Sequence, residues 1–569
     1  MLNRRELLSS VAATGIGTGA FHRAIAALAS KPDISADMIR NAEWISGIEL
    51  SESQRSKILQ VVRRNVAEVM RLRTVPLAFD DAPATYFQPL QKGGPNRVAI
   101  RQPPGRMAAP RVWSKQPLPN SEEGIAFLPV QELAALIRSG RLKSTQLTKL
   151  YLARLKKYGP MLRCVVNVTE ELALKQAANA DREIEAGNYR GPLHGIPWGA
   201  KDLLAVPGYP TTWGIPHFKD RELKETATVV ERLVQAGAVL VAKLSMGALA
   251  MGDRWFGGMT RSPWNAKRGS SGSSSGSAAA TAAGLVGFSL GTETLGSIIS
   301  PSRRCGVTGF RPTFGRVSRA GCMSLSWSMD KVGPICRSVE GAAIVFDAIH
   351  GSDGIDPTVG DFDFNWPPRA QTGKLKVGYV RRRGQKIDER EDLRIVQSLG
   401  CELVEVQLPH EIPVRTMTSI INIEGASMFE ELIRAGHTEG WNSWERTFQS
   451  ANFFSAVDYL RMQRARTRLM RLFEEAIEGV DVLINAGDLL HTNLTGHPSV
   501  AVPDAFRKGE TPTPICSSFT GRLHEDEKML ALAATYQEKV DAHLKRPPID
   551  KWLKAYEEGT LDGEKKPPR

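Results

Sequence analysis

Helical and strand-like hydrophobic patterns alternate along most of the chain beyond residue 120. Apolar residues recur at helical spacing in 130–138, 144–156, 228–235 and 455–477. Short apolar runs that are typical of buried strands occupy 238–242, 375–380, 403–408 and 480–484. Helices that alternate with strands in this way predict an α/β body in which helical layers cover a sheet.

The segment 30–124 has a different character and is predicted to be an N-terminal extension. Ser51 and Gln54 have the spacing of a capping box, in which each side chain binds the backbone of the other. The apolar residues of 58–72 then follow helical spacing, which indicates one amphipathic helix. The stretch 76–119 is rich in proline and is expected to be irregular and to wrap around the main body.

The first 29 residues have the layout of a secretory signal. Arg4 and Arg5 precede a mildly apolar stretch, 11–21, and small residues end at Ala29. The paired arginines favour twin-arginine export to the periplasm. His22 and Arg23 interrupt the apolar character, so a frayed helix on a cytoplasmic protein is the alternative.

Composition narrows the class of protein. The chain has 569 residues, 42% hydrophobic and 24% charged, which is typical of a globular protein with a large core. The net charge of +13 permits nucleic-acid binding, but no basic helix accompanies it, so no nucleic-acid partner is expected. Six cysteines and ten histidines lack metal-ligand spacing; most of the cysteines are expected to be buried thiols, and no metal is implied.

A serine-rich run suggests the chemistry. Residues 269–277 read GSSGSSSGS and pass into the alanine-rich 278–284; a glycine-bounded turn at 291–297 ends on Ser297. A hydroxyl-lined loop that feeds a helix suits a serine nucleophile beside an anion site. The literal G-x-S-x-G at 272–276 offers an alternative, a nucleophile elbow at Ser274, but an elbow needs a strand directly before it.

Several motifs together resemble the amidase signature family. The resembling segments are 195–202, 269–277, 291–297, 305–318, 330–334 and 493–498. The resemblance spans about 125–545 and leaves 546–569 as a C-terminal tail. It implies a single domain with a mixed central sheet between helical layers.

The resemblance also implies a catalytic triad of serine, serine and lysine. Lys201 matches the lysine, Ser297 the nucleophile, and Ser273 the bridging serine that follows a cis peptide bond. An ordinary lysine is protonated at neutral pH and cannot act as a base. Burial lowers a lysine's pKa, and the apolar neighbours of Lys201 predict that it is buried.

The turn before the nucleophile is implied to be the oxyanion hole. Its donors are the backbone N–H groups of Thr294, Leu295, Gly296 and Ser297. The family usually has glycine where this chain has Leu295, and Leu295 is expected to change the shape of the pocket. The family often has arginine two or three positions after the nucleophile, where this chain has isoleucine and serine. The missing arginine indicates a neutral amide substrate.

A few large side chains are candidates for substrate contact, with core packing as the equal alternative for each. These are Met246, Met251, Trp255, Phe256 and Trp327.

The sequence therefore predicts an amide hydrolase that works through an acyl-enzyme, without metal or cofactor. One alternative within the family is the glutaminase subunit of a tRNA-dependent amidotransferase, which works with partner chains in the cytoplasm. Another is a binding protein whose site is catalytically silent. The sequence leaves the substrate open, and it leaves a homodimer possible.

Overall fold

The computed structural model describes residues 34–77, 83–85, 117–367, 374–381, 384, 387–507, 509 and 511–561. The signal predicted at 1–29, most of the proline-rich stretch 76–119 and the end of the tail lie outside these residues. The strands are β1 (Val165–Val168), β2 (Pro197–Lys201), β3 (Val239–Leu244), β4 (Arg254–Trp255), β5 (Gly258–Met259), β6 (Phe288–Glu293), β7 (Thr308–Arg311), β8 (Lys331–Cys336), β9 (Lys376–Tyr379), β10 (Glu402–Glu405), β11 (Val482–Ile484), β12 (Ser499–Arg507) and β13 (Thr513–Gly521).

The α-helices are α3 (Ala36–Ser46), α4 (Glu52–Leu72), α5 (Glu122–Ala126), α6 (Val130–Arg138), α7 (Ser144–Leu162), α8 (Glu170–Glu185), α9 (Thr228–Gln235), α10 (Ser275–Ala282), α11 (Ile299–Cys305), α12 (Val339–Ile349), α13 (Glu391–Ser398), α14 (Val414–Met417), α15 (Ser419–Met428), α16 (Glu430–Arg434), α17 (Trp444–Ala451), α18 (Ala456–Ala476), α19 (Leu489–Thr495), α20 (Asp526–Val540) and α21 (Ile549–Glu557). Short 3₁₀ turns are η1 (Pro216–Phe218), η2 (Ala248–Ala250), η4 (Ile387–Glu389) and η5 (Ala542–Leu544).

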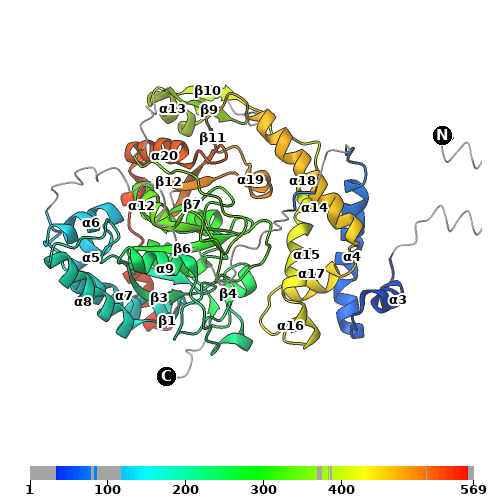
Figure 1. Cartoon of the computed structure of the whole chain (residues 1–569), viewed down its shortest axis with the longest axis horizontal. Helices are drawn as coiled ribbons and strands as arrows, with labels where there is room; N and C mark the ends of the chain where they lie inside the picture. Colours follow the sequence, from blue (N-terminus) through cyan, green and yellow to red (C-terminus); the bar gives the residue numbers. More distant parts are fainter. Residues whose placement is uncertain are drawn as a thin grey trace, which may run out of the picture.

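One large mixed sheet forms the centre of the molecule (Figure 1). Its eleven strands lie in the order β1-β3-β2-β6-β8-β7-β12-β13-β11-β9-β10, and the β4–β5 hairpin is separate. β3, β2 and β6 run parallel, whereas β8 runs antiparallel to β6. The carboxyl ends of β2 and β6 therefore meet the start of β8 at one edge of the sheet.

Helices cover both faces of this sheet, as predicted. The apolar faces of α6, α9, α12 and α20 enter the largest core cluster, whereas α7, α8, α10 and α21 contribute to a second cluster. α10 is built almost wholly from small residues, all of them buried. Small side chains let this helix approach the sheet closely: a Cβ on Gly276 would lie only 2.5 Å from the backbone nitrogen of Ser245.

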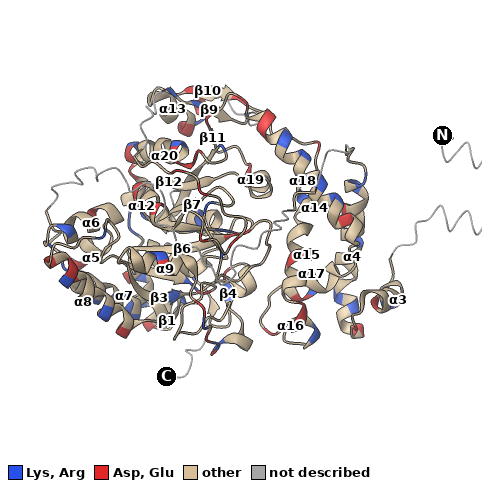
Figure 2. Ribbon diagram, in the orientation of Figure 1, with Lys and Arg blue, Asp and Glu red and all other residues tan. Residues whose placement is uncertain are grey.

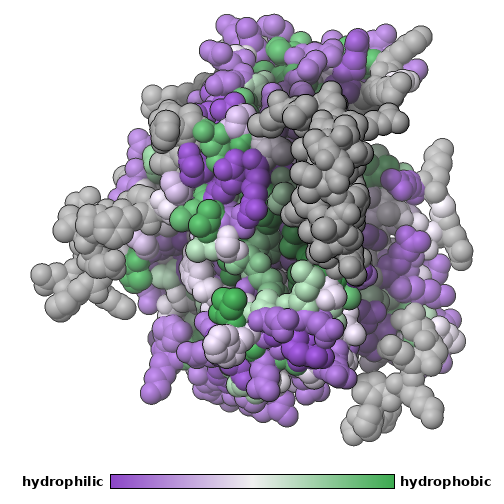
Figure 3. All heavy atoms as spheres, turned by 90° about the vertical axis from the view of Figure 1, so that its right-hand side faces the viewer, coloured by the Kyte–Doolittle hydropathy of each residue, from purple (hydrophilic) through white to green (hydrophobic). Residues whose placement is uncertain are grey.

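A helical lobe, which we define as α3, α4 and α14–α18, lies beside the sheet on the right of Figure 1. α4 packs against α17 and is tied to α18 by an ion pair between Arg73 and Asp458 at 3.0 Å. The N-terminal extension thus docks on a segment almost 400 residues further along the chain. Seen from the lobe, polar side chains cover both ends of this face, and apolar side chains appear among polar ones in its middle (Figure 3).

The sequence predicted most of these elements well. The helices expected at 130–138 and 228–235 match α6 and α9, and the capping box of Ser51 and Gln54 begins α4. The helix expected at 144–156 continues to Leu162, and the strand expected at 238–242 runs from Val239 to Leu244.

The surface charge is mixed in sign. Basic and acidic residues alternate on the outer helices, including α4, α7, α8 and α18 (Figure 2). Within the part of the chain that the structure describes, no helix is long and apolar enough to cross a membrane.

Candidate active site

Three strand ends assemble the candidate site. Lys201 is the last residue of β2, and Thr292 lies near the end of the parallel neighbour β6. Asp330 directly precedes β8, which begins at the same edge because it runs antiparallel to β6. In open α/β sheets, ligands bind outside the carboxyl ends of the strands, and this edge has that position.

The amine of Lys201 is held by three hydroxyl groups. Its Nζ lies 2.9 Å from Ser273 Oγ, 3.0 Å from Ser274 Oγ and 2.8 Å from Thr292 Oγ1. Nζ also donates to the carbonyl of Thr292 at 3.3 Å. The structure thus brings Lys201 and Ser273 together across 72 positions of sequence. Thr292, the third hydroxyl, was not singled out by the sequence.

The surroundings of Lys201 favour its neutral form. The side chain is fully buried, and burial lowers its pKa from 10.5 to about 7, although the carboxylates of Asp330 and Glu293 act in the opposite direction. A large fraction of Lys201 is therefore unprotonated at neutral pH. An amine in this state can accept a proton from the hydroxyl that it contacts.

Ser273 lies two residues before α10, in the loop that the serine-rich run predicted. The peptide bond between Gly272 and Ser273 is cis, as the resemblance implied. The N–H of Ser274 donates to the carbonyl of Ser297 at 3.1 Å, which ties this loop to the turn that carries Ser297.

The alternative of a nucleophile elbow at Ser274 is wrong. The residues that precede it form turns instead of a strand. Its side chain is also fully engaged: Oγ donates to the carbonyl of Thr292 and accepts from the N–H of the same residue, both at 3.1 Å. Ser274 therefore joins α10 to β6.

A buried carboxylate shapes the turn that follows β6. Glu293 Oε2 accepts the N–H groups of Ile298 and Ile299 at 2.8 and 2.9 Å, and Oε1 lies 2.7 Å from the guanidinium of Arg311. Burial opposes the charge, but Arg311 and the backbone donors outweigh it and lower the pKa of Glu293 to about 2. An ionised Glu293 thus fixes the backbone that directly follows Ser297.

Three backbone N–H groups of the turn that ends on Ser297 are available to bind a ligand. In the described structure, the backbone N–H groups of Leu295, Gly296 and Ser297 donate to no protein acceptor. The positive φ of this turn, 85°, falls at Gly296, so Leu295 has an ordinary backbone. Leu295 packs against the main core and is not among the residues that line the neighbouring cavity, so its expected effect on the shape of the pocket stays a prediction.

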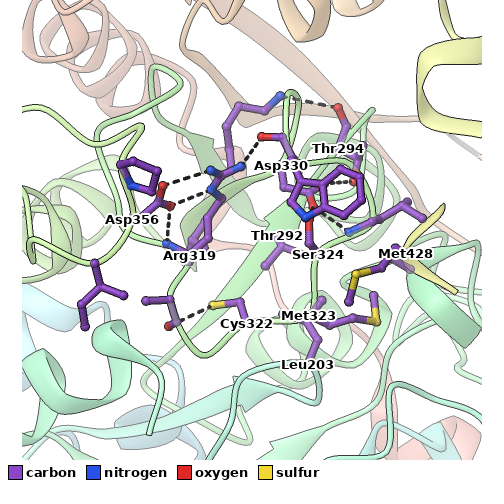
Figure 4. A pocket seen from close by; sticks show the side chains of 18 residues that line it. Leu203, Thr292, Thr294, Arg319, Cys322, Met323, Ser324, Asp330, Asp356 and Met428 are labelled. Atoms are coloured by element: carbon purple, nitrogen blue, oxygen red, sulfur yellow. Dashed lines mark hydrogen bonds and ion pairs between the residues drawn. The ribbon is translucent and has the colours of Figure 1, made fainter. Parts of the chain in front are cut away.

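A cavity of about 330 Å³ opens beside these groups (Figure 4). Thr292, whose hydroxyl contacts Lys201, and Thr294 line it, whereas Lys201, Ser273 and Ser297 are not among its lining residues. Apolar side chains supply much of the rest, and they come from distant parts of the chain: Leu203, Met323, Leu325, Trp327, Val332, Ile355 and Met428. Cys322 also lines the cavity and is half-buried, whereas the other five cysteines are buried as expected.

Two of the four charged side chains that line the cavity form an ion pair with each other. Arg319 binds both carboxylate oxygens of Asp356, at 2.8 and 3.1 Å (Figure 4). Asp330 accepts the hydroxyl of Thr294 at 2.5 Å and the N–H of Leu325 at 2.7 Å. Lys331 is buried, and burial together with the nearby Arg311 lowers its pKa well below the usual value.

The substrate candidates from sequence are distributed unevenly. Trp327 lines the cavity and is 47% exposed. Met246 is fully buried in the main core and does not line the cavity, so it is core packing. Trp255 and Phe256 stack edge-to-face with each other away from the lining residues, and Met251 contacts Ser443 in the helical lobe.

The position two residues after Ser297 faces away from this cavity. Ile299 is buried and lines a separate, smaller cavity of about 130 Å³. The two cavities share no lining residue. The absence of an arginine at Ile299 therefore gives no structural argument about the charge of the substrate.

Comparisons with known proteins agree with this geometry. The Amidase family profile matches residues 146–504. A glutamyl-tRNA(Gln) amidotransferase subunit from Chloroflexus aurantiacus is 33% identical over 481 residues, covering 74% of this chain and 98% of the relative. The corresponding protein from Coxiella burnetii is 30% identical, with coverage of 74% and 99%. The peptide amidase of Stenotrophomonas maltophilia superposes with a TM-score of 0.65 at 29% identity and covers 74% of this chain and 98% of the amidase.

Proposed function

This chain belongs to the amidase signature family, and from that premise we propose that it hydrolyses a neutral amide through a Ser–Ser–Lys acyl-enzyme mechanism. The observation that carries the proposal is the contact of 2.9 Å between the buried amine of Lys201 and the hydroxyl of Ser273. A buried amine with a pKa of about 7 is suited to act as a general base near neutral pH.

In the proposed reaction the three side chains act in the order that the family resemblance implies. Lys201 takes the proton of Ser273 as Ser273 takes that of Ser297, and Ser297 Oγ attacks the amide carbonyl. The free N–H groups of 295–297 stabilise the oxyanion, each by about 3–4 kcal/mol. The proton returns to the departing nitrogen through Ser273. Water then repeats the sequence in place of serine and releases the acid from Ser297.

The cavity supports the choice of a neutral, apolar substrate. Its lining is largely aliphatic and sulfur-containing, with Trp327 as the one aromatic side chain among the lining residues. The charges of Arg319 and Asp356 are engaged with each other, so neither calls for a counter-charge on the ligand. An amide with an alkyl or aryl group, or a peptide amide with apolar side chains, fits this lining.

Serine variants test the chemistry without knowledge of the substrate. We expect a fluorophosphonate to label the wild-type protein, and Ser297→Ala to abolish both labelling and turnover in a panel of small amides. Ser273→Ala should lower the labelling rate strongly. Ser275→Ala is the matched control, because this buried hydroxyl of the same loop bonds to Ser245 O and not to Lys201. Normal turnover by Ser297→Ala contradicts the proposal, as does a wild-type protein that is neither labelled nor active.

The similarity to amidotransferase subunits supports a second candidate, a glutaminase that delivers ammonia to a partner chain. The two candidates differ in substrate. A glutaminase should release ammonia from glutamine in preference to apolar amides, and it should copurify with partner subunits. Hydrolysis of apolar amides by the isolated chain, with glutamine unreacted, decides for the hydrolase.

We also propose that the chain is exported through its twin-arginine leader. Replacement of Arg4 and Arg5 by lysine should retain the protein in the cytoplasm, and the wild-type protein should appear in the periplasm cleaved near Ala29. Equal distribution of both forms between compartments contradicts export. Light scattering of the purified protein tests the homodimer, which stays a prediction.

A further inference from the structure

The smaller cavity, behind the turn that carries Ser297, is lined by a buried carboxylate, one oxygen of which has no hydrogen-bond partner among the described residues. Asp488 is only 5% exposed and lines this cavity of about 130 Å³. Its Oδ2 has no hydrogen-bond partner, and the described residues offer it no ion pair. A buried carboxylate without a close partner is strongly unfavourable. Arg303 lines the same cavity but is exposed and forms no ion pair with Asp488, so a small cation would complete the site.

The other lining residues have the donors that a cation requires. Asn485, Ser499 and Ser518 place an amide oxygen and two hydroxyl groups around the cavity. The amide oxygen of Asn485 also accepts the N–H of Ser518 at 2.8 Å and its hydroxyl at 3.4 Å. The hydroxyl of Ser499 is engaged only by a long contact from Thr520 at 3.4 Å. Oxygen donors of this kind suit hard cations such as Na⁺, K⁺ or NH₄⁺. The volume is several times that of one water, about 30 Å³, so an ion can enter with part of its hydration shell.

The charge balance selects a monovalent ion. Asp488 supplies one negative charge, and Arg303 lies at the exposed rim of the same cavity. A second positive charge on the ion would be repelled by this guanidinium and left uncompensated by the single carboxylate. The described residues also contain no group of three or more His, Cys, Asp or Glu that could hold a metal ion, which argues against a transition metal.

The cavity adjoins the reactive turn without opening into the substrate cavity. Ile299 lines the cavity and is the first residue of α11. Its backbone N–H donates to Glu293 Oε2 at 2.9 Å. Leu489, on the opposite wall, lies 3.4 Å from where a Cβ on Gly296 would be. We propose that Asp488, Asn485, Ser499 and Ser518 form a binding site for a monovalent cation that stabilises the fold behind this turn.

Thermal unfolding in different chloride salts tests the proposal. The probes are NaCl, KCl and NH₄Cl, compared at equal concentration with N-methyl-D-glucamine chloride, whose cation is too large for the cavity. In the wild-type protein, at least one small cation should raise Tm by about 1–3 °C when it is present in excess over its Kd. Equal Tm values in all four salts overturn the proposal.

Two variants locate the effect. Asp488→Asn removes the carboxylate and should lose the ion-specific rise, whereas the matched control Asp220→Asn, at an exposed carboxylate, should keep it. Ile299→Arg places a guanidinium on the wall of the cavity and should raise Tm in N-methyl-D-glucamine chloride while removing the response to small cations. If Asp488→Asn fails to fold, Ile299→Arg decides alone. A full ion-specific rise in either variant puts the ion elsewhere and overturns the proposal.

Discussion

The pH dependence of serine reactivity tests the proposed role of Lys201 most directly. The perturbation is a change of pH, and the observable is the rate at which a fluorophosphonate labels Ser297. This reagent needs no knowledge of the natural substrate, and its attack by Ser297 requires the same loss of a proton that amide hydrolysis does. The labelling rate should therefore follow the fraction of protein in which Lys201 is neutral.

The structure sets the size of the effect. Burial lowers the pKa of Lys201 from 10.5 to about 7, which corresponds to about 5 kcal/mol against the charged amine. At pH 7, about half of the protein then has a neutral Lys201, whereas a lysine of ordinary pKa would be neutral in only about one molecule in 3,000. The labelling rate should rise about tenfold per pH unit below pH 6 and level off above about pH 8.

The assay is a time course of labelling across this pH range, with intact protein detected by mass spectrometry. Ser297→Ala gives the background, and Lys201→Met should be slow and should lose the pH dependence. A rate that climbs steadily beyond about pH 9 would mean that Lys201 keeps its ordinary pKa. A rate that is flat from about pH 5 to 10 would mean that no base titrates at all. Either result refutes the reasoning.

Further predictions concern stability and specificity. The pKa of Lys201 is lower in the folded protein than in the unfolded chain, so the unfolded chain binds more protons between about pH 7 and 10.5. In this window the stability of the wild-type protein, relative to Lys201→Met, should therefore rise with pH by up to about 1.4 kcal/mol per pH unit. Parallel curves of Tm against pH for the two proteins contradict this. Glu293→Gln leaves Arg311 without its buried partner, so it should lower the free energy of unfolding, measured by denaturation, by about 3–5 kcal/mol, and it should slow the labelling of Ser297. An unchanged labelling rate would mean that the turn does not depend on this carboxylate. Trp327→Ala should lower kcat/KM about tenfold for bulky apolar amides and leave small aliphatic amides nearly unaffected; an equal loss for both would place Trp327 outside substrate recognition.

Local patterns in the sequence were sufficient to predict those features that depend on interactions between residues close together in the chain. The ends of α6 and α9, and the capping box that begins α4, depend on side chains within a few residues of one another. The motifs around Lys201 and Ser273 likewise indicated that these two residues belong to one site. Residue type could not choose between alternatives that look alike: Met246 suited a pocket and the core equally, and the structure places it fully in the core.

Only the tertiary structure decided how these groups act on one another. Lys201 becomes a candidate base because parallel pairing of β2 with β6 buries it beside Thr292, 91 residues away. The cavity beside Thr292 brings Met428 together with residues such as Met323, which lies more than 100 positions earlier. The lack of a hydrogen-bond partner at Asp488 Oδ2 likewise depends on which distant segments pack around it. Desolvation and cavity shape depend on contacts between distant segments, whereas helix and strand periodicity is written within single ones.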